Sequence, residues 1–131
     1  GGHRKITPDE YETIKKYLQK FPESMHIRAA FIIASEAIYS PSAEYKRVPD
    51  KIINKAKQWS EQYPKKIEFQ EAYFGLLFSR LKYAQAQDMR NEQRRVYREM
   101  KTVAERANYS EYNESNQLME SVDILHRVFG Y

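Results

Sequence analysis

Hydrophobic residues recur at helical spacing along this chain, and their density is highest in residues 65–86, KKIEFQEAYFGLLFSRLKYAQA. Placed at about 100° per residue, this stretch carries one apolar face around Phe69, Tyr73 and Leu76 and a second around Phe74 and Leu81. The narrow strip left for water holds Glu68, Glu71, Ser79 and Lys82. A helix with two apolar faces normally packs between other helices, so we expect this one in the middle of a layered all-α fold.

The same spacing predicts further helices, and capping or breaking residues mark their ends. Thr7 and Glu10 can form a capping box around Pro8, which suits the first position of a helix. Pro22 and Pro64 each end a helix, because proline restricts the residue before it. The expected helices cover residues 7–20, 24–39, 49–63, 65–86, 89–107 and a last stretch from near 110–113 to 130.

Two of the helix ends differ in how strongly the sequence marks them. Gly130 is a good terminator for the last helix. Gln87 and Asp88 are the expected break after the central helix, but no Gly or Pro enforces that break. One continuous helix over residues 65–107 is therefore the alternative.

The order of the helices repeats along the chain. Phe21-Pro22 is followed by a helix that is apolar around most of its circumference, a loop and a one-sided helix, and Tyr63-Pro64 is followed by the same series 42 residues later. The first and last helices of the chain are one-sided. Helices with one apolar face at both ends of the chain, with helices apolar on two sides between them, predict stacked antiparallel helical hairpins. The last hairpin is expected to be incomplete or swapped into a neighbour.

Short motifs in these hairpins resemble the tetratricopeptide family. Residues 74–78, FGLLF, are similar to the large-Gly-x-x-aromatic core of that family's first helix, and residues 33–37 fit the same place with Ala34 as the small residue. The spacing of the family's second helix with its closing Pro is found at Ile52, Ala56, Trp59 and Pro64. The resemblance covers residues 24–107, with repeats longer than the usual ~34 residues. It implies a short right-handed α-solenoid of about six helices.

The resemblance also implies a protein- or peptide-binding groove lined by the first helix of each hairpin. Carried onto this sequence, the candidate groove residues are Arg28, Ser35, Tyr39, Tyr73, Arg80 and Tyr83. The alternative is that this face is core between neighbouring buried helices. Arg80 separates the two, because in a groove its guanidinium is partly exposed, whereas in a core it is buried against an acidic residue such as Glu36 or Asp123.

The helix expected at residues 89–107 carries a basic strip opposite its apolar stripe. The members of this basic strip are Arg90, Arg94, Arg98 and Lys101. Like charges one turn apart destabilise a helix by about a few tenths of a kcal/mol, so an anion- or nucleic-acid-binding surface is the alternative function. An ordinary solvated helix face gives the same pattern, and a net charge of +4 with a pI of about 9.2 is only modestly basic.

The sequence predicts no catalytic, metal-binding or cofactor-binding centre. Cysteine is absent, His26 and His126 lie a hundred residues apart, and the four glycines never cluster. The longest apolar run, residues 29–34, is far shorter than the ~20 residues of a membrane-spanning helix, so no membrane association is expected. The absence of a disulfide framework favours a reducing, cytoplasmic location.

The length of 131 residues suits one domain. Gly1, Gly2 and His3 stand where an initiator Met is expected, so residues 1–6 are assigned to a cloning remnant and a disordered start. Residues 7–131 are assigned to a single helical-repeat domain of a larger protein. We therefore expect a non-enzymatic interaction module with a protein or peptide partner, and the sequence leaves its oligomeric state open.

Overall fold

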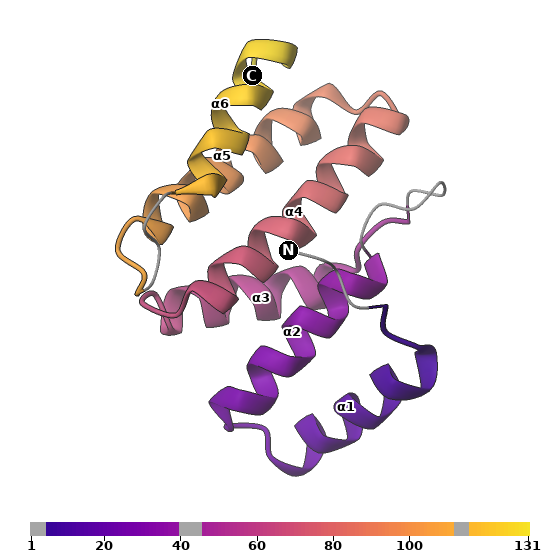
Figure 1. Cartoon of the computed structure of the whole chain (residues 1–131). Helices are drawn as coiled ribbons and strands as arrows, with labels where there is room; N and C mark the ends of the chain where they lie inside the picture. The colour runs from indigo at the N-terminus through magenta and orange to yellow at the C-terminus, as the bar shows by residue number, and fades with distance from the viewer. Residues whose placement is uncertain (1–4, 40–45, 112–115) are drawn as a thin grey trace.

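Every regular element in the described part of the chain is an α-helix. The computed structural model describes residues 5–39, 46–111 and 116–131 (Figure 1), so residues 1–4 of the predicted disordered start lie outside it. Its helices are α1 (Pro8–Lys20), α2 (Met25–Tyr39), α3 (Asp50–Gln62), α4 (Ile67–Ala86), α5 (Arg90–Ala107) and α6 (Gln117–Phe129). The predicted all-α class is confirmed, and no helix of the described part combines the length and apolarity that crossing a membrane requires.

Local capping residues set the start of α1 as the sequence predicts. The Thr7 hydroxyl accepts a hydrogen bond from the Glu10 backbone N–H at 3.1 Å, and Glu10 Oε1 accepts one from the Thr7 N–H at 3.4 Å. Such a cap contributes about 0.5–2 kcal/mol to a helix. The predicted capping box is confirmed.

The break after α4 is also confirmed, and the alternative of one continuous helix is wrong. Asp88 adopts φ 54°, the left-handed conformation that ends α4 without a glycine. The Met89 N–H then donates to the Ala84 carbonyl at 2.8 Å and closes the turn. The chain therefore reverses, and α5 returns along α4 (Figure 1).

The last helix begins later than predicted. It starts at Gln117 instead of near residues 110–113, of which 112 and 113 lie outside the described part. The Glu111 N–H donates to the Lys65 carbonyl at 2.8 Å, which holds the chain leaving α5 against the turn between α3 and α4. The Asn116 side chain accepts from the Met119 N–H at 3.1 Å and caps α6 at this later position.

α4 is the middle helix of the stack, as its two apolar faces predict. It packs against α2, α3 and α5, while α1 lies on α2 and α6 lies on α5 (Figure 1). α4 and α5 form a close antiparallel pair, whereas α2 contacts α3 much less extensively. The two successive helix pairs of the predicted repeat are therefore packed differently.

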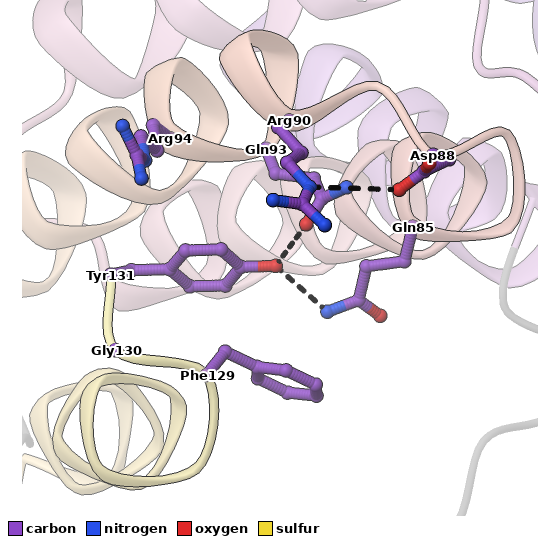
Figure 2. Close-up of a pocket in the computed structure, with 8 residues that line it drawn as sticks. All are labelled: Gln85, Asp88, Arg90, Gln93, Arg94, Phe129, Gly130 and Tyr131. Carbon is purple, nitrogen blue, oxygen red and sulfur yellow. Dashed lines mark hydrogen bonds and ion pairs between the residues drawn. The ribbon is translucent and has the colours of Figure 1, made fainter.

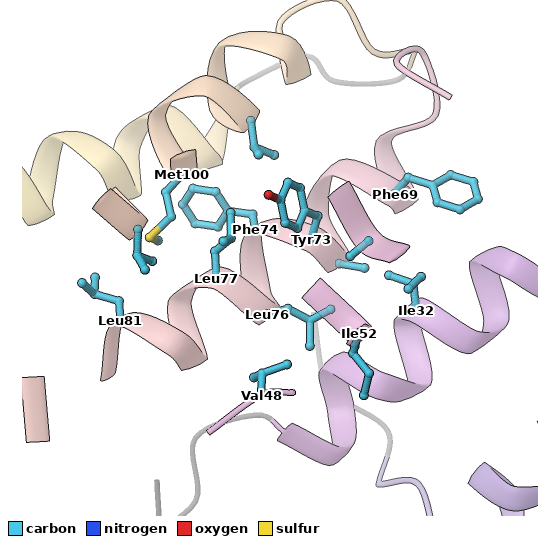
Figure 3. Packing of buried hydrophobic residues seen from close by; sticks show 14 of the residues in the cluster. Ile32, Val48, Ile52, Phe69, Tyr73, Phe74, Leu76, Leu77, Leu81 and Met100 are labelled. Carbon is cyan, nitrogen blue, oxygen red and sulfur yellow. The ribbon is translucent and has the colours of Figure 1, made fainter. Parts of the chain in front are cut away.

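The core surrounds α4 and draws side chains from all six helices. Its largest fully buried hydrophobic side chains include Tyr73, Phe69, Ile32, Leu76, Leu81 and Met100 (Figure 3). Trp59 is buried, and its ring and that of Phe31 form a T-shaped pair with ring centroids 6.3 Å apart. Ser79, predicted on the polar strip of α4, is only 2% exposed and donates to the Gly75 carbonyl at 3.2 Å. The polar strip is therefore narrower than the sequence predicts.

Gly75 lets α2 approach α4 closely. A Cβ atom at this position would overlap the side chain of Glu36 on α2. The glycine at the centre of the FGLLF motif therefore has a packing role between the two helices.

Candidate functional site

The six predicted groove residues do not share one surface, and two of them are used inside the fold. The Arg28 guanidinium lies 5.2 Å from the Trp59 ring centroid and donates to Gln62 Oε1 at 3.0 Å. Ser35 is fully buried, with its hydroxyl 2.7 Å from the Tyr11 hydroxyl. Both side chains therefore join α2 to its neighbours α3 and α1.

Tyr73 and Arg80 lie in a different place, a groove between α3 and α5 whose floor is α4. This central groove has a volume of about 300 Å³. Its polar lining includes Asp50 and Lys57 from α3, Tyr73 and Arg80 from α4, and Glu92 and Glu99 from α5. The second helices of the predicted hairpins form its walls, where the sequence predicts the first helices. Tyr83 is half-buried and lines neither this groove nor the two cavities described below.

Arg80 is held by the walls of the central groove. Its Nη1 donates to Asp50 Oδ1 at 2.8 Å and its Nη2 to Glu92 Oε1 at 3.3 Å, and the side chain is 11% exposed. The predicted partners Glu36 and Asp123 are wrong, because Glu36 packs on a different face of α4 and Asp123 is exposed on α6. Arg80 is therefore closer to the buried alternative than to an open ligand contact.

Two titratable groups of the central groove, Asp50 and Tyr73, have shifted pKa values. The hydrogen bond from Arg80, together with the charge of Arg47, lowers the pKa of Asp50. The Tyr73 hydroxyl donates to Glu99 Oε1 at 2.8 Å, and burial, reinforced by this hydrogen bond, raises the pKa of Tyr73. Asp50 therefore stays ionised and Tyr73 stays protonated. Each group is already bonded within the protein, Asp50 to Arg80 and Tyr73 to Glu99.

A buried polar cluster that the hydrophobic pattern does not reveal joins α3, α4 and α5. Gln70 is fully buried, and its amide nitrogen donates to the Ser60 and Tyr63 carbonyls, each at 3.0 Å. The Ser60 hydroxyl donates to Gln70 Oε1 and accepts from Arg106 Nη1 at 2.6 Å. Every buried side-chain nitrogen and oxygen of the described residues has a partner, so this cluster has a structural role.

Tyr39 lines a cavity between α1, α2 and α3, which we call the amino-terminal cavity. Its volume is about 340 Å³. Its floor is apolar and aromatic, since Phe31 stacks on Tyr11 with ring centroids 5.7 Å apart and Ile52 lies beside them. The hydrogen bond between Tyr11 and Ser35 fixes the Tyr11 ring in this position.

Three lysines surround the opening of the amino-terminal cavity. They are Lys15 of α1 and Lys51 and Lys55 of α3. Lys15 pairs with Glu12 at 2.8 Å, and this hydrogen bond raises the pKa of Lys15 and lowers that of Glu12. Lys51 and Lys55 form no ion pair with any other described residue. Lys51 and Lys55 therefore place positive charge that has no ion-pair partner among the described residues beside an apolar floor.

A third cavity, the carboxy-terminal cavity, lies between the α4–α5 turn and the end of α6 (Figure 2) and has a volume of about 410 Å³. The Tyr131 hydroxyl accepts from Gln85 Nε2 at 3.0 Å and donates to Gln93 Oε1 at 2.7 Å. Arg90 and Arg94, two members of the basic strip, line the same cavity. The sequence pattern identifies these arginines but does not connect them with the last residues of the chain.

All four members of the basic strip are exposed on α5. Arg90 lies 3.8 Å from Asp88, and both side chains are more than four-fifths exposed. Arg94, Arg98 and Lys101 form no ion pair within the described ranges. The structure thus brings Arg90 and Arg94 to the carboxy-terminal cavity and leaves the other two further along the helix.

The described residues contain no candidate metal site, and no known protein indicates a function by its similarity to this chain. In residues 5–39, 46–111 and 116–131, no group of three or more Asp, Glu or His side chains is arranged to hold a metal ion. The tetratricopeptide resemblance stays a prediction from sequence motifs. Comparisons with models of protein families, with curated proteins and with solved structures give no significant match.

Proposed function

We propose that this chain is a non-enzymatic protein-interaction domain whose amino-terminal cavity binds an acidic peptide segment of a partner protein. The observation that supports the proposal is an apolar aromatic floor beneath lysines that have no ion-pair partner among the described residues. A volume of about 340 Å³ falls within the range of roughly 300–1,000 Å³ that is usual for ligand sites.

An apolar side chain of the peptide covers the floor of the cavity. The rings of Phe31 and Tyr11 and the side chain of Ile52 provide the surface for it. Burying one Leu- or Phe-sized side chain contributes about 1.5–3 kcal/mol. This anchor supplies most of the affinity, as buried anchors do in other interfaces.

Carboxylates beside the anchor meet the lysines. Lys51 and Lys55 lie one turn apart on α3, a rise of about 6 Å, and Lys15 reaches the same cavity from α1. An exposed ion pair contributes only about 0.2–1 kcal/mol, so the lysines select acidic sequences and speed association more than they add affinity.

The central groove is a weaker candidate because its own charges neutralise one another. Arg80 pairs with Asp50 and Glu92, and Glu92 also pairs with Arg95. A charged peptide has to compete with these existing ion pairs, whereas Lys51 and Lys55 form no ion pair within residues 5–39, 46–111 and 116–131.

We also propose that α2–α5 form two units of a short right-handed, tetratricopeptide-like solenoid. Support comes from the close α4–α5 pair and from Gly75, which brings α2 against α4. The looser contact between α2 and α3 is the main departure from equal repeats. An experimental structure tests the proposal by whether α2 and α3 superpose on α4 and α5.

Selection from a random peptide display library tests the peptide-binding function. The selected sequences should place Asp or Glu next to a large apolar residue. The double variant Lys51→Glu, Lys55→Glu should then bind a selected peptide at least about tenfold more weakly, because two attractions become repulsions. Isothermal titration measures the affinity, and thermal melting checks that the variant is folded.

Lys57→Glu is the matched control. It reverses one lysine at an exposed position of α3, which is half the charge change of the double variant, so its effect is compared with that of Lys51→Glu alone. Lys57 lines the central groove instead of the amino-terminal cavity. Binding that falls with Lys57→Glu and survives the double change moves the site to the central groove and contradicts the proposal. A library that yields no acidic, apolar consensus contradicts it as well.

A further inference from the structure

Three aromatic rings form a ladder beside the carboxy-terminal cavity. The Tyr131 ring lies 5.4 Å from the buried Tyr97 ring of α5, and Phe129 stacks on Tyr131 with centroids 5.5 Å apart and planes at 24°. Gly130 adopts φ 71°, a left-handed conformation that lets the chain turn between the two rings. The ladder ends in Phe129, which is 47% exposed, so an aromatic surface is open at the cavity (Figure 2).

Positive charge runs from this cavity along α5. Arg90, Arg94 and Arg98 follow at intervals of four residues, a rise of about 6 Å each. The acidic residues Glu92 and Glu99 do not neutralise this row, because they bond to Arg80 and Tyr73 in the central groove. Asp88 partly offsets Arg90 across 3.8 Å, with both side chains more than four-fifths exposed. The positive charge of the basic strip therefore comes mainly from Arg94, Arg98 and Lys101, which form no ion pair with a described residue.

The cavity also offers a hydrogen-bond acceptor close to the exposed ring. Gln85 uses its amide nitrogen to bond Tyr131, and its carbonyl oxygen points away from that residue (Figure 2). This oxygen takes part in no hydrogen bond among the described residues. It can accept from the amino group of a bound base.

We propose that the carboxy-terminal cavity and the basic strip form a binding site for single-stranded nucleic acid. A base stacks on Phe129 with its edge toward Gln85, and consecutive phosphates follow Arg90, Arg94 and Arg98 along α5. Aromatic rings that stack bases beside a row of cations are the usual means of binding single strands. A single strand supplies a ring and a phosphate in every nucleotide, whereas an acidic peptide needs an aromatic residue at one particular place, so an open ring beside a row of arginines favours nucleic acid. The site is separate from the amino-terminal cavity.

Fluorescence anisotropy with a labelled oligouridylate and a labelled oligothymidylate, titrated at several salt concentrations, tests the site. The unmodified chain should bind at low salt, and its affinity should fall as salt rises. Arg90→Gln with Arg94→Gln should weaken binding about tenfold and lower the salt slope by about 1.4, since each phosphate contact on a single strand contributes about 0.7. Phe129→Ala should weaken binding about tenfold through lost stacking and leave the salt slope unchanged.

The control removes two charges elsewhere. Lys16 and Lys20 are exposed on α1, which lies at the other end of the molecule from α6 (Figure 1), and changing both to Gln should leave affinity within about twofold of the unmodified chain. Lys51→Glu with Lys55→Glu should also keep oligonucleotide binding, which separates this site from the proposed peptide site.

Three results would overturn the proposal. The first is no oligonucleotide binding at low salt. The second is equal losses in the Arg90/Arg94 variant and in the α1 control, which indicate attraction by net charge alone. The third is binding of a phosphoserine peptide that depends on Arg90 and Arg94 but not on Phe129, with no oligonucleotide binding, which assigns the strip to a phosphorylated protein.

Discussion

Replacing Arg80 by Ala removes the cation that joins α3, α4 and α5. The change deletes the ion pairs to Asp50 and Glu92 and a hydrogen bond to the Val48 carbonyl at 3.4 Å. Asp50 is 67% exposed, so its pair contributes at most about 1 kcal/mol. Glu92 is 13% exposed but keeps Arg95 as a partner, so its cost stays below the roughly 3–5 kcal/mol of a buried charge left alone. With the lost packing of the arginine stem, we expect the free energy of unfolding to fall by about 2–3 kcal/mol.

Urea unfolding at neutral pH measures this loss directly, and a thermal melt should show a decrease in Tm of roughly 10 °C for a chain of this size. Arg80→Ala leaves the Glu92 carboxylate with one ion-pair partner fewer. Adding Glu92→Gln removes that charge, so the double variant should regain part of the lost stability. Arg80→Met keeps most of the stem and separates packing from charge. A loss below about 0.5 kcal/mol in Arg80→Ala, the size of an ordinary surface change, would refute the reasoning and restore Arg80 as a ligand contact.

Two further substitutions test buried aromatic residues of α3 and α4. Trp59→Ala should lower the free energy of unfolding, measured in urea, by about 3–5 kcal/mol, because the buried ring packs on Phe31 and lies against the Arg28 guanidinium. A loss under about 1 kcal/mol contradicts that position. Tyr73→Phe should cost about 1 kcal/mol at neutral pH by removing the hydrogen bond to Glu99. Because the pKa of Tyr73 is raised in the folded state, the unmodified chain should lose stability as the pH rises above about 10, the unfolded value. Tyr73→Phe should lose less there, and identical pH profiles would exclude Tyr73 as the titrating group.

The helices were predictable because the signals that define them are local. The capping box at Thr7 and Glu10 forms within one turn, and the two apolar faces of α4 follow from side-chain spacing alone. The break after α4 was predictable at Gln87 and Asp88, although its mechanism, a left-handed Asp88, carries no strong sequence signal. Signals that act over a few residues therefore fix the elements.

The groove was harder to predict because it depends on how the helices pack against one another. Two apolar faces on α4 require two sets of neighbours, but they do not say which neighbour covers which face. The face with Tyr73 and Arg80 turned out to meet α3 and α5, while Gly75 marks the approach of α2. The partners of Arg80 lie 30 residues before it and 12 after it, and no local pattern selects them.

Buried polar residues were missed for a related reason. Gln70 lies between the two apolar faces and is not part of the predicted polar strip, so the hydrophobic pattern gives no reason to expect a buried amide there. In the structure its amide satisfies the Ser60 and Tyr63 carbonyls at the end of α3, which makes its burial favourable. Such a residue is recognisable only when its partners are already in place.

The distribution of side chains with and without partners among the described residues explains why the two proposed sites lie beside the first and last helices, with Gln85 at the end of α4 taking part in one of them. α4 is covered by α2, α3 and α5, so polar groups such as Arg80, Tyr73 and Gln70 are bonded within the protein. α1 packs mainly on α2 and α6 mainly on α5, and the cavities beside them keep cations without ion-pair partners among the described residues, such as Lys55 and Arg94. A ligand gains most where it replaces water on groups that have no partner in the protein, and loses where it must break an existing ion pair. We therefore expect binding at the amino-terminal cavity beside α1 and at the carboxy-terminal cavity beside α6. The central helix α4 links the helices that carry the two cavities.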